Sequence, residues 1–155
     1  MSEAIFVVAC GAAKLDRPAP ARELYCSPTF RHILAAAEAE AEATTRDLGV
    51  PSRVLIMSAK HGLVSPDAEL EPYNVTLDDP GAISTVALAA SMILAGVTEG
   101  SEFYAMLPGR YLCRLAAAAP ADVMVVDTYE AAPGIGFQRA VASSLLRHTD
   151  DDLGA

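Results

Sequence analysis

The segment from Ser58 to Asn74 holds the richest mixture of chemically reactive side chains in the sequence. It reads Ser58-Ala59-Lys60-His61-Gly62-Leu63 and, after a short interval, Glu71-Pro72-Tyr73-Asn74. A hydroxyl, an ammonium, an imidazole, a carboxylate, a phenol and an amide in one segment can hold a planar, hydrogen-bonding ligand. Tyr73 would stack on that ligand, and His61 and Asn74 would contact its edge. A solvated surface with a shaped turn explains the spacing equally well.

The segment Cys10-Gly11-Ala12-Ala13-Lys14 follows an apolar run and could bind an anion. Gly11 lets backbone N–H groups turn toward a negative charge, and Lys14 would add a positive one. A tight turn with a solvated lysine is the alternative, because the glycine spacings of the P-loop and the dinucleotide fingerprint are absent. The Cys10 thiol could be activated by Lys14, although a buried structural cysteine is the commoner case.

Two later segments place glycine at the start of an expected helix. Pro108-Gly109-Arg110-Tyr111 would direct free N–H groups and Arg110 toward an anion, or else only start a helix with Tyr111 in the core. Pro133-Gly134-Ile135-Gly136-Phe137-Gln138 is a second glycine-rich helix start. This segment is evidence for a ligand site because it follows an expected strand, as the other three segments do.

Four apolar runs of strand length must position these segments. They read as uninterrupted rather than alternating, which is typical of parallel strands covered on both faces, and span Ile5 to Ala9, Arg53 to Met57, Glu102 to Leu107 and Asp122 to Val126. Each precedes a helical segment, so we expect a single three-layer α/β/α sandwich over residues 1–148, with a four-stranded mainly parallel sheet in the order 2-1-3-4 and an acidic tail at 149–155.

The expected helices differ in how much of their surface is apolar. Ser27 and Pro28 are good first residues for a helix with one apolar face. The helix expected over residues 82–96 is apolar almost all round, so it needs cover on more than one side and could bury a face in a homodimer. Further helices should follow Gly109, with Cys113 as a small core residue, and Gly136.

The connections after the first two strands are unusually long, at about 17 and about 24 residues, against the usual two to six. Long loops at the carboxyl edge of a parallel sheet usually form a ligand site. The sequence therefore predicts one site at that edge, with these ligand-binding residues: Cys10, Gly11, Lys14, Ser58, Lys60, Gly62, Tyr73, Pro108, Gly109, Arg110, Tyr111, Gly134, Gly136 and Gln138.

Composition restricts the class of protein and of ligand. The 155 residues are 52% apolar without an 18-residue uncharged run of apolar residues or a signal peptide, so we expect one cytoplasmic domain and no membrane contact. Three widely spaced cysteines favour free thiols, with no metal site and no cofactor motif. A net charge of −9 disfavours long duplex nucleic acid but leaves it open, whereas a small nucleotide or nucleobase fits better.

The combination of Cys10-Gly11, Ser58-Ala59-Lys60-His61-Gly62-Leu63, Glu71-Pro72-Tyr73 and Gly134-Ile135-Gly136 resembles a bacterial and phage domain family of unknown function. That family is distantly similar to the YaaA peroxide-stress proteins. The resemblance implies a fold like that of uracil-DNA glycosylases, by analogy, and a link to DNA protection under oxidative stress. This chain departs from the pattern at Ala12, Ala13 and His61, where relatives are more basic or carry Tyr, and both changes weaken the case for contact with DNA.

The leading hypothesis is a nucleotide-binding domain that hydrolyses an N-glycosidic bond. Glu71 would stabilise the oxocarbenium-like sugar and position water, and His61 or Asn74 would donate to the departing base. Lys14 and Ser58 would hold a phosphate. The alternative is a non-catalytic nucleotide sensor or stress-response protein that uses the same pocket.

Overall fold

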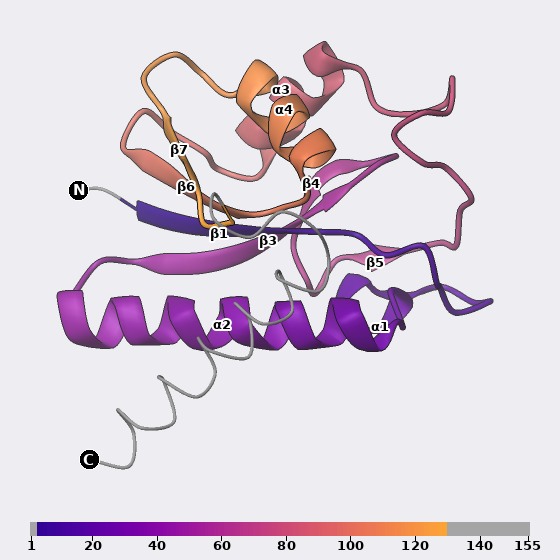
Figure 1. Cartoon of the computed structure of the whole chain (residues 1–155), viewed down its shortest axis with the longest axis horizontal. Helices are drawn as coiled ribbons and strands as arrows, with labels where there is room; N and C mark the ends of the chain where they lie inside the picture. Colours follow the sequence, from indigo (N-terminus) through magenta and orange to yellow (C-terminus); the bar gives the residue numbers. More distant parts are fainter. Residues whose placement is uncertain (1–2, 130–155) are drawn as a thin grey trace.

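The computed structural model describes residues 3–129, which fold around one mainly parallel sheet (Figure 1). Its five strands, in order across the sheet, are β4 (Gly62–Val64), β3 (Ser52–Ser58), β1 (Glu3–Ala9), β6 (Ser101–Met106) and β7 (Met124–Asp127). β4 alone runs antiparallel to its neighbour within this sheet. The expected count of four strands was wrong because β4, with three residues, is too short to show an apolar pattern.

Helices cover both faces of this sheet. α2 (Pro28–Leu48) lies along one face, and α3 (Thr85–Leu94) and α4 (Gly109–Ala118) lie on the other (Figure 1). The expected start of α2 is confirmed: Ser27 Oγ accepts a hydrogen bond from the Phe30 N–H at 3.1 Å, and Pro28 is the first helical residue. The helix expected over residues 82–96 is α3, with shorter bounds.

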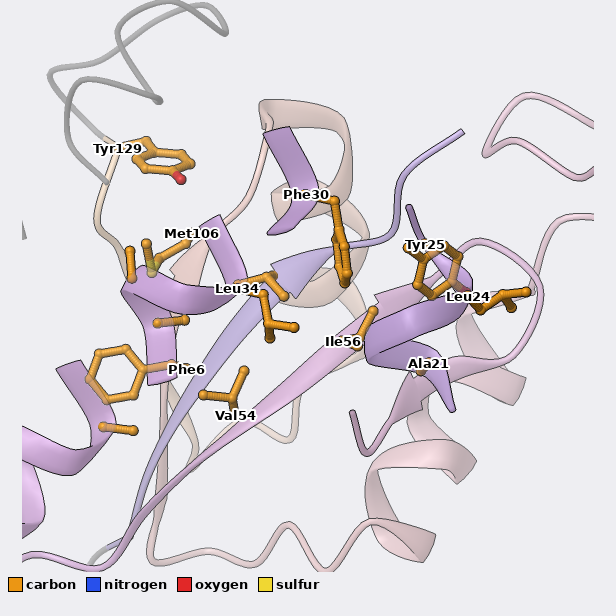
Figure 2. Close-up of a cluster of buried hydrophobic side chains, with 14 of the residues drawn as sticks. Phe6, Ala21, Leu24, Tyr25, Phe30, Leu34, Val54, Ile56, Met106 and Tyr129 are labelled. Carbon is orange, nitrogen blue, oxygen red and sulfur yellow. The ribbon is translucent and has the colours of Figure 1, made fainter. Parts of the chain in front are cut away.

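β1 contributes to two hydrophobic cores because its successive side chains point to opposite faces. Phe6 and Val8 belong to the core beneath α2, part of which Figure 2 shows. Ile5 and Val7 belong to the core beneath α3 and α4. Burial on both faces explains why the sequence of this strand is apolar without alternation.

A small second sheet joins the two long loops that the sequence places at the carboxyl edge. β2 (Ala19–Pro20), which follows β1 in the chain, pairs antiparallel with β5 (Glu69–Leu70), which follows β3 and β4. α1 (Ala21–Leu24) comes directly after β2, and an isolated bridge pairs Lys14 with Tyr25. The pairing fixes both loops at the same end of the molecule (Figure 1).

Three further expectations concern surfaces and the end of the chain. α3 buries Leu88 and Met92 but exposes Val86, Ile93 and Leu94, so its apolar surface faces two ways. Cys113 is exposed on α4, so its expected place in the core was wrong. The expected fourth helix, the tail at 149–155 and Gly134, Gly136 and Gln138 lie outside the described residues. Within residues 3–129, no helix is both long and apolar enough to cross a membrane.

Candidate functional site

Tyr73 is the centre of a polar cluster at the carboxyl edge of the sheet. Its hydroxyl lies 2.5 Å from the hydroxyl of Tyr25 and 2.7 Å from Ser58 Oγ. Ser58 is the last residue of β3, whereas Tyr25 and Tyr73 follow α1 and β5 in the two loops joined by the small sheet. The pairing of β2 with β5 therefore sets the distance between the two phenols.

The direction of these hydrogen bonds follows from Ser58. Its Oγ accepts the backbone N–H groups of Lys60 at 3.2 Å and His61 at 3.0 Å, which occupies the lone pairs of the hydroxyl oxygen. The Ser58 hydroxyl must therefore donate to Tyr73, and Tyr73 in turn donates to Tyr25. The Tyr25 hydroxyl, which is fully buried, ends this chain of hydrogen bonds.

Both lysines of the sequence lie at this cluster. Lys14 Nζ is 4.4 Å from the centroid of the Tyr73 ring and 5.7 Å from that of Tyr25, and Lys60 Nζ is 5.9 Å from the Tyr73 centroid. Cation–π contacts of this kind contribute only a modest stabilisation energy at partly exposed positions. Within residues 3–129, neither ammonium forms an ion pair with a carboxylate. The cluster therefore carries two positive charges that no described acidic group balances.

Cys10 and Tyr111 extend the cluster toward the next strand. Cys10 follows β1 directly, Tyr111 lies in the first turn of α4, and the Cys10 Sγ to Tyr111 Oη distance is 3.3 Å. Burial raises the pKa of the Tyr25, Tyr73 and Tyr111 phenols, and the charge interaction with Cys10 raises the pKa of each further. At neutral pH all three phenols are therefore protonated and able to donate.

His61 borders the same ring from its edge. The centroids of the His61 and Tyr73 rings are 5.3 Å apart and the rings are perpendicular. Burial lowers the pKa of His61, and the positive charge of Lys60 lowers it further. The imidazole is therefore neutral at neutral pH, so it adds hydrogen-bonding capacity without a third positive charge.

A hollow of about 200 Å³ adjoins the cluster through Cys10, and we call it the Cys10 hollow. It lies between the end of β1, the first turn of α2 and the end of β6. Its lining residues are Ala9, Cys10, Gly11, Ser27, Thr29, Phe30, Ile33, Met106 and Pro108. The wall is therefore mostly apolar, and Gly11 lies so near Ser27 that a side chain there would crowd it.

The structure brings together most of the predicted site residues in the described part of the chain. Cys10, Lys14, Ser58, Lys60, His61, Tyr73 and Tyr111 form the cluster, and Gly11 and Pro108 line the adjoining hollow. The role expected of Ser58 changes, because its hydroxyl is fully buried and already committed to Tyr73 and to two backbone N–H groups. Ser58 therefore positions the cluster instead of meeting a phosphate.

Five other predicted residues lie outside the cluster. Glu71, Asn74 and Gly109 are exposed. Arg110 forms an exposed ion pair with Asp78. Gly62 has φ +78°, and a Cβ there would collide with Ser91, so this glycine serves a turn and close packing against α3.

Sequence reasoning missed Tyr25 and Arg114. Tyr25 stands on the same long loop as Lys14, and an aromatic residue beside one of only two lysines was the available signal. Arg114 on α4 donates to the carbonyl oxygens of Ile83 at 3.0 Å and Leu77 at 3.1 Å. These bonds hold the far end of the loop that carries Tyr73, and nothing in the sequence pattern indicates them.

A larger hollow, of about 560 Å³, lies elsewhere, between α2 and β3. Its arginines include Arg22, paired with Glu38 and Asp67, and Arg53, paired with Glu3. These paired charges have less to offer an anionic ligand than the two lysines of the cluster. The smaller Cys10 hollow therefore adjoins the stronger candidate site.

Within residues 3–129, no three His, Cys, Asp or Glu side chains come together to hold a metal ion.

Comparison with known proteins identifies a family for this chain, but that family has no known function. Residues 5–139 match a protein-family model described as a family of unknown function. No curated protein and no solved structure matches the chain.

Proposed function

The chain belongs to the DUF6884 family, which has no assigned activity, so we propose from the site itself that the protein binds a nucleotide with its phosphate against Lys14 and Lys60. The resemblance to an uncharacterised domain family is confirmed by this assignment, whereas the likeness to YaaA-type proteins stays a prediction.

The position of the two lysines carries this proposal. Two like charges beside one ring repel each other, and a chain of net charge −9 offers many carboxylates with which they could have paired. A phosphate between the two ammonium groups would replace that repulsion with charge-assisted hydrogen bonds. Tyr111 and Cys10, which are half-buried and bond each other, leave one further hydrogen free to donate.

The surroundings of the lysines support a nucleotide over a bare phosphate. Tyr73 and His61 offer ring surfaces beside the charges, and the Cys10 hollow provides mostly apolar space next to them. Recognition of a planar, apolar group and an anion in adjoining places fits the two halves of a nucleotide.

Calorimetric titration with nucleoside monophosphates and with inorganic phosphate tests the proposal. We expect Lys14→Gln and Lys60→Gln each to weaken nucleotide binding by about tenfold, because one charge-assisted hydrogen bond is worth ~1.5 kcal/mol. Arg46→Gln is the matched control, since it removes one charge near the opposite end of α2. Binding that ignores both lysine variants, or no binding of any nucleotide, would refute the proposal.

Hydrolysis of the N-glycosidic bond is the second candidate, and the position of Glu71 is the observation that favours it. Glu71 stands two residues before Tyr73 on the same segment, exposed, and within residues 3–129 it has no polar partner. A carboxylate free of partners can stabilise a developing sugar cation if the bound ligand reaches it. Chromatography of the titration mixtures would then detect free base, and Glu71→Gln would abolish its release while leaving affinity within a few-fold. Recovery of intact nucleotide would instead indicate a sensor.

A further inference from the structure

α3 presents an apolar surface to solvent along most of its length. Beyond its first residue, every exposed side chain of the helix is apolar, and Val86, Ile93 and Leu94 are 81, 75 and 89% exposed. We call these exposed residues the α3 stripe: Val86, Ala87, Ala90, Ile93 and Leu94. Soluble monomers seldom expose large apolar side chains together, so such a surface usually marks an interface.

The α3 stripe is symmetric about Ala90. At 3.6 residues per turn its five residues fall within an arc of about 120° with Ala90 at the centre. Val86 and Leu94 lie at equal distances along the helix on either side of Ala90. A small residue between two large ones lets two helices approach closely where they cross. If two copies cross antiparallel at Ala90, Val86 of one copy meets the partner's Leu94.

The charge distribution also suits a second copy at this surface. The chain carries a net charge of −9, so two copies repel each other wherever acidic residues meet. Among the helices within residues 3–129, α3 is the one without a charged side chain. Two copies can therefore approach through the α3 stripe without bringing like charges of this helix into contact.

A hollow of about 460 Å³ between β4 and α3 connects the stripe with the polar cluster around Tyr73. Its lining residues are Arg53, Leu55, His61, Leu63, Val64, Ser65, Ser91, Leu94 and Ala95. Leu94 belongs to the stripe, whereas the centroid of the His61 ring lies 5.3 Å from that of Tyr73. A second copy that packs on Leu94 therefore also borders the hollow that His61 lines.

The area of the surface matches that of a weak dimer. A large aliphatic side chain carries roughly 100 Å² of apolar surface, so the three large side chains of the stripe offer roughly 250 Å² per copy at their exposure. A specific interface buries about 500 Å² or more on each side. The rim of the hollow between β4 and α3 can supply the remainder, because Leu94 belongs to both surfaces.

We propose that two copies of this chain associate through the α3 stripe, with the two α3 helices antiparallel and crossing at Ala90. Val86 of each copy packs against the partner's Leu94, and each copy covers part of the hollow beside the partner's His61. The interface is isologous, because the same patch serves both copies. The dimer needs no bound ligand and stands apart from the proposed nucleotide binding.

Sedimentation equilibrium of the full chain tests this dimer. We expect the wild type to associate at micromolar concentration, because the area lies at the low end for specific interfaces. Val86→Lys and Leu94→Glu should each raise the dissociation constant by about tenfold or more, since each dimer contains the substitution twice. Leu48→Glu should leave the constant unchanged and is the matched control, because Leu48 is exposed at the end of α2 on the other face of the sheet.

The double variant with Val86→Lys and Leu94→Glu tests the antiparallel crossing. Its two new charges should lie opposite each other across the interface, so it should associate more tightly than either single variant by about threefold or more, and less tightly as salt is added.

Cross-linking at the centre of the stripe provides a gain of signal that does not depend on a charged variant. In a Cys113→Ser background, which removes the exposed thiol of α4, Ala90→Cys should form a disulfide-linked dimer under mild oxidation. Val86→Cys should not, because only position 90 faces itself across the twofold axis.

Each result supports or overturns the proposal. A wild type that stays monomeric at millimolar concentration overturns it, and the stripe would then be covered by a different protein or by the chain beyond residue 129. A dimer that neither single variant weakens overturns α3 as its interface. A double variant that associates more weakly than both single variants, or the lack of a cross-link at position 90, overturns the antiparallel crossing.

Discussion

Replacing Tyr73 with phenylalanine tests whether the hydrogen-bond chain holds the candidate site together. The substitution keeps the ring and removes the one oxygen that contacts the Tyr25 hydroxyl and Ser58 Oγ. Tyr25 and Ser58 are both 0% exposed, so their hydroxyls lose a partner without gaining water. The effect should therefore exceed that of an ordinary surface hydroxyl.

The size of the effect follows from the two groups left unpaired. A buried donor or acceptor without a partner costs about 1–3 kcal/mol. Tyr25 ends the chain and can turn its hydroxyl, so we expect a total near the lower part of the summed range, about 3 kcal/mol. For a domain of this size that corresponds to a fall in Tm of roughly 10 °C.

Urea denaturation of the Tyr73→Phe, Ser58→Ala and double variants measures the energetic coupling between the Tyr73 and Ser58 hydroxyls. If the hydrogen-bond chain exists, the double variant should lose about 1 kcal/mol less free energy of unfolding than the two single variants lose together. The reason is that both substitutions remove the same hydrogen bond. Tyr104→Phe is the matched control and should change the free energy of unfolding by less than about 0.5 kcal/mol. A Tyr73→Phe variant as stable as that control, or strictly additive losses, would show that the phenols do not form this chain.

Three further predictions concern pH, packing and association. The folded-state pKa of His61 is lowered, so wild-type stability should fall as the pH drops below about 6.5, where the unfolded chain takes up the proton first, and His61→Asn should flatten that part of a stability-versus-pH curve. Gly62→Ala should lower the free energy of unfolding by at least about 2 kcal/mol because of its positive φ and the contact with Ser91, whereas Gly109→Ala, which meets nothing within 4 Å, should cost nothing in the same urea titration. If α3 buries its exposed side chains in a homodimer, Leu94→Lys should shift the mass measured by light scattering from dimer to monomer, and a wild-type monomer at high concentration would contradict the idea.

The parts of the fold that sequence could predict are those that depend on patterns over many residues. β1 and β3 are buried on both faces, so their uninterrupted apolar runs indicated parallel strands. α2 carried its own start signal at Ser27. By contrast, β4 and the β2–β5 pair have two or three residues in each strand, and such short pairings are decided by contacts across the fold that no local pattern records.

The same distinction explains which site residues were predicted. Lys14, Lys60 and Tyr73 were found because each follows a strand that ends at the carboxyl edge. Tyr25 was missed because its place beside Tyr73 depends on the two-residue β2–β5 pairing. Glu71 lies two residues before Tyr73 in the sequence, but nearness along an extended segment does not fix the direction of a side chain.

The chemistry of the cluster itself limits what it can bind. Lys14, Lys60 and the Cys10–Tyr111 pair offer hydrogens, and the raised pKa values keep the phenols from supplying negative charge at neutral pH. Within residues 3–129 no acidic side chain pairs with either lysine, and salt screens exposed charges that lie farther apart than the Debye length of about 8 Å. A cationic or donor-rich ligand would add unpaired donors to a site that already has too many, whereas a ligand rich in acceptors would satisfy them. The preference for an anion is thus a local property, which the net charge of the protein does not reveal.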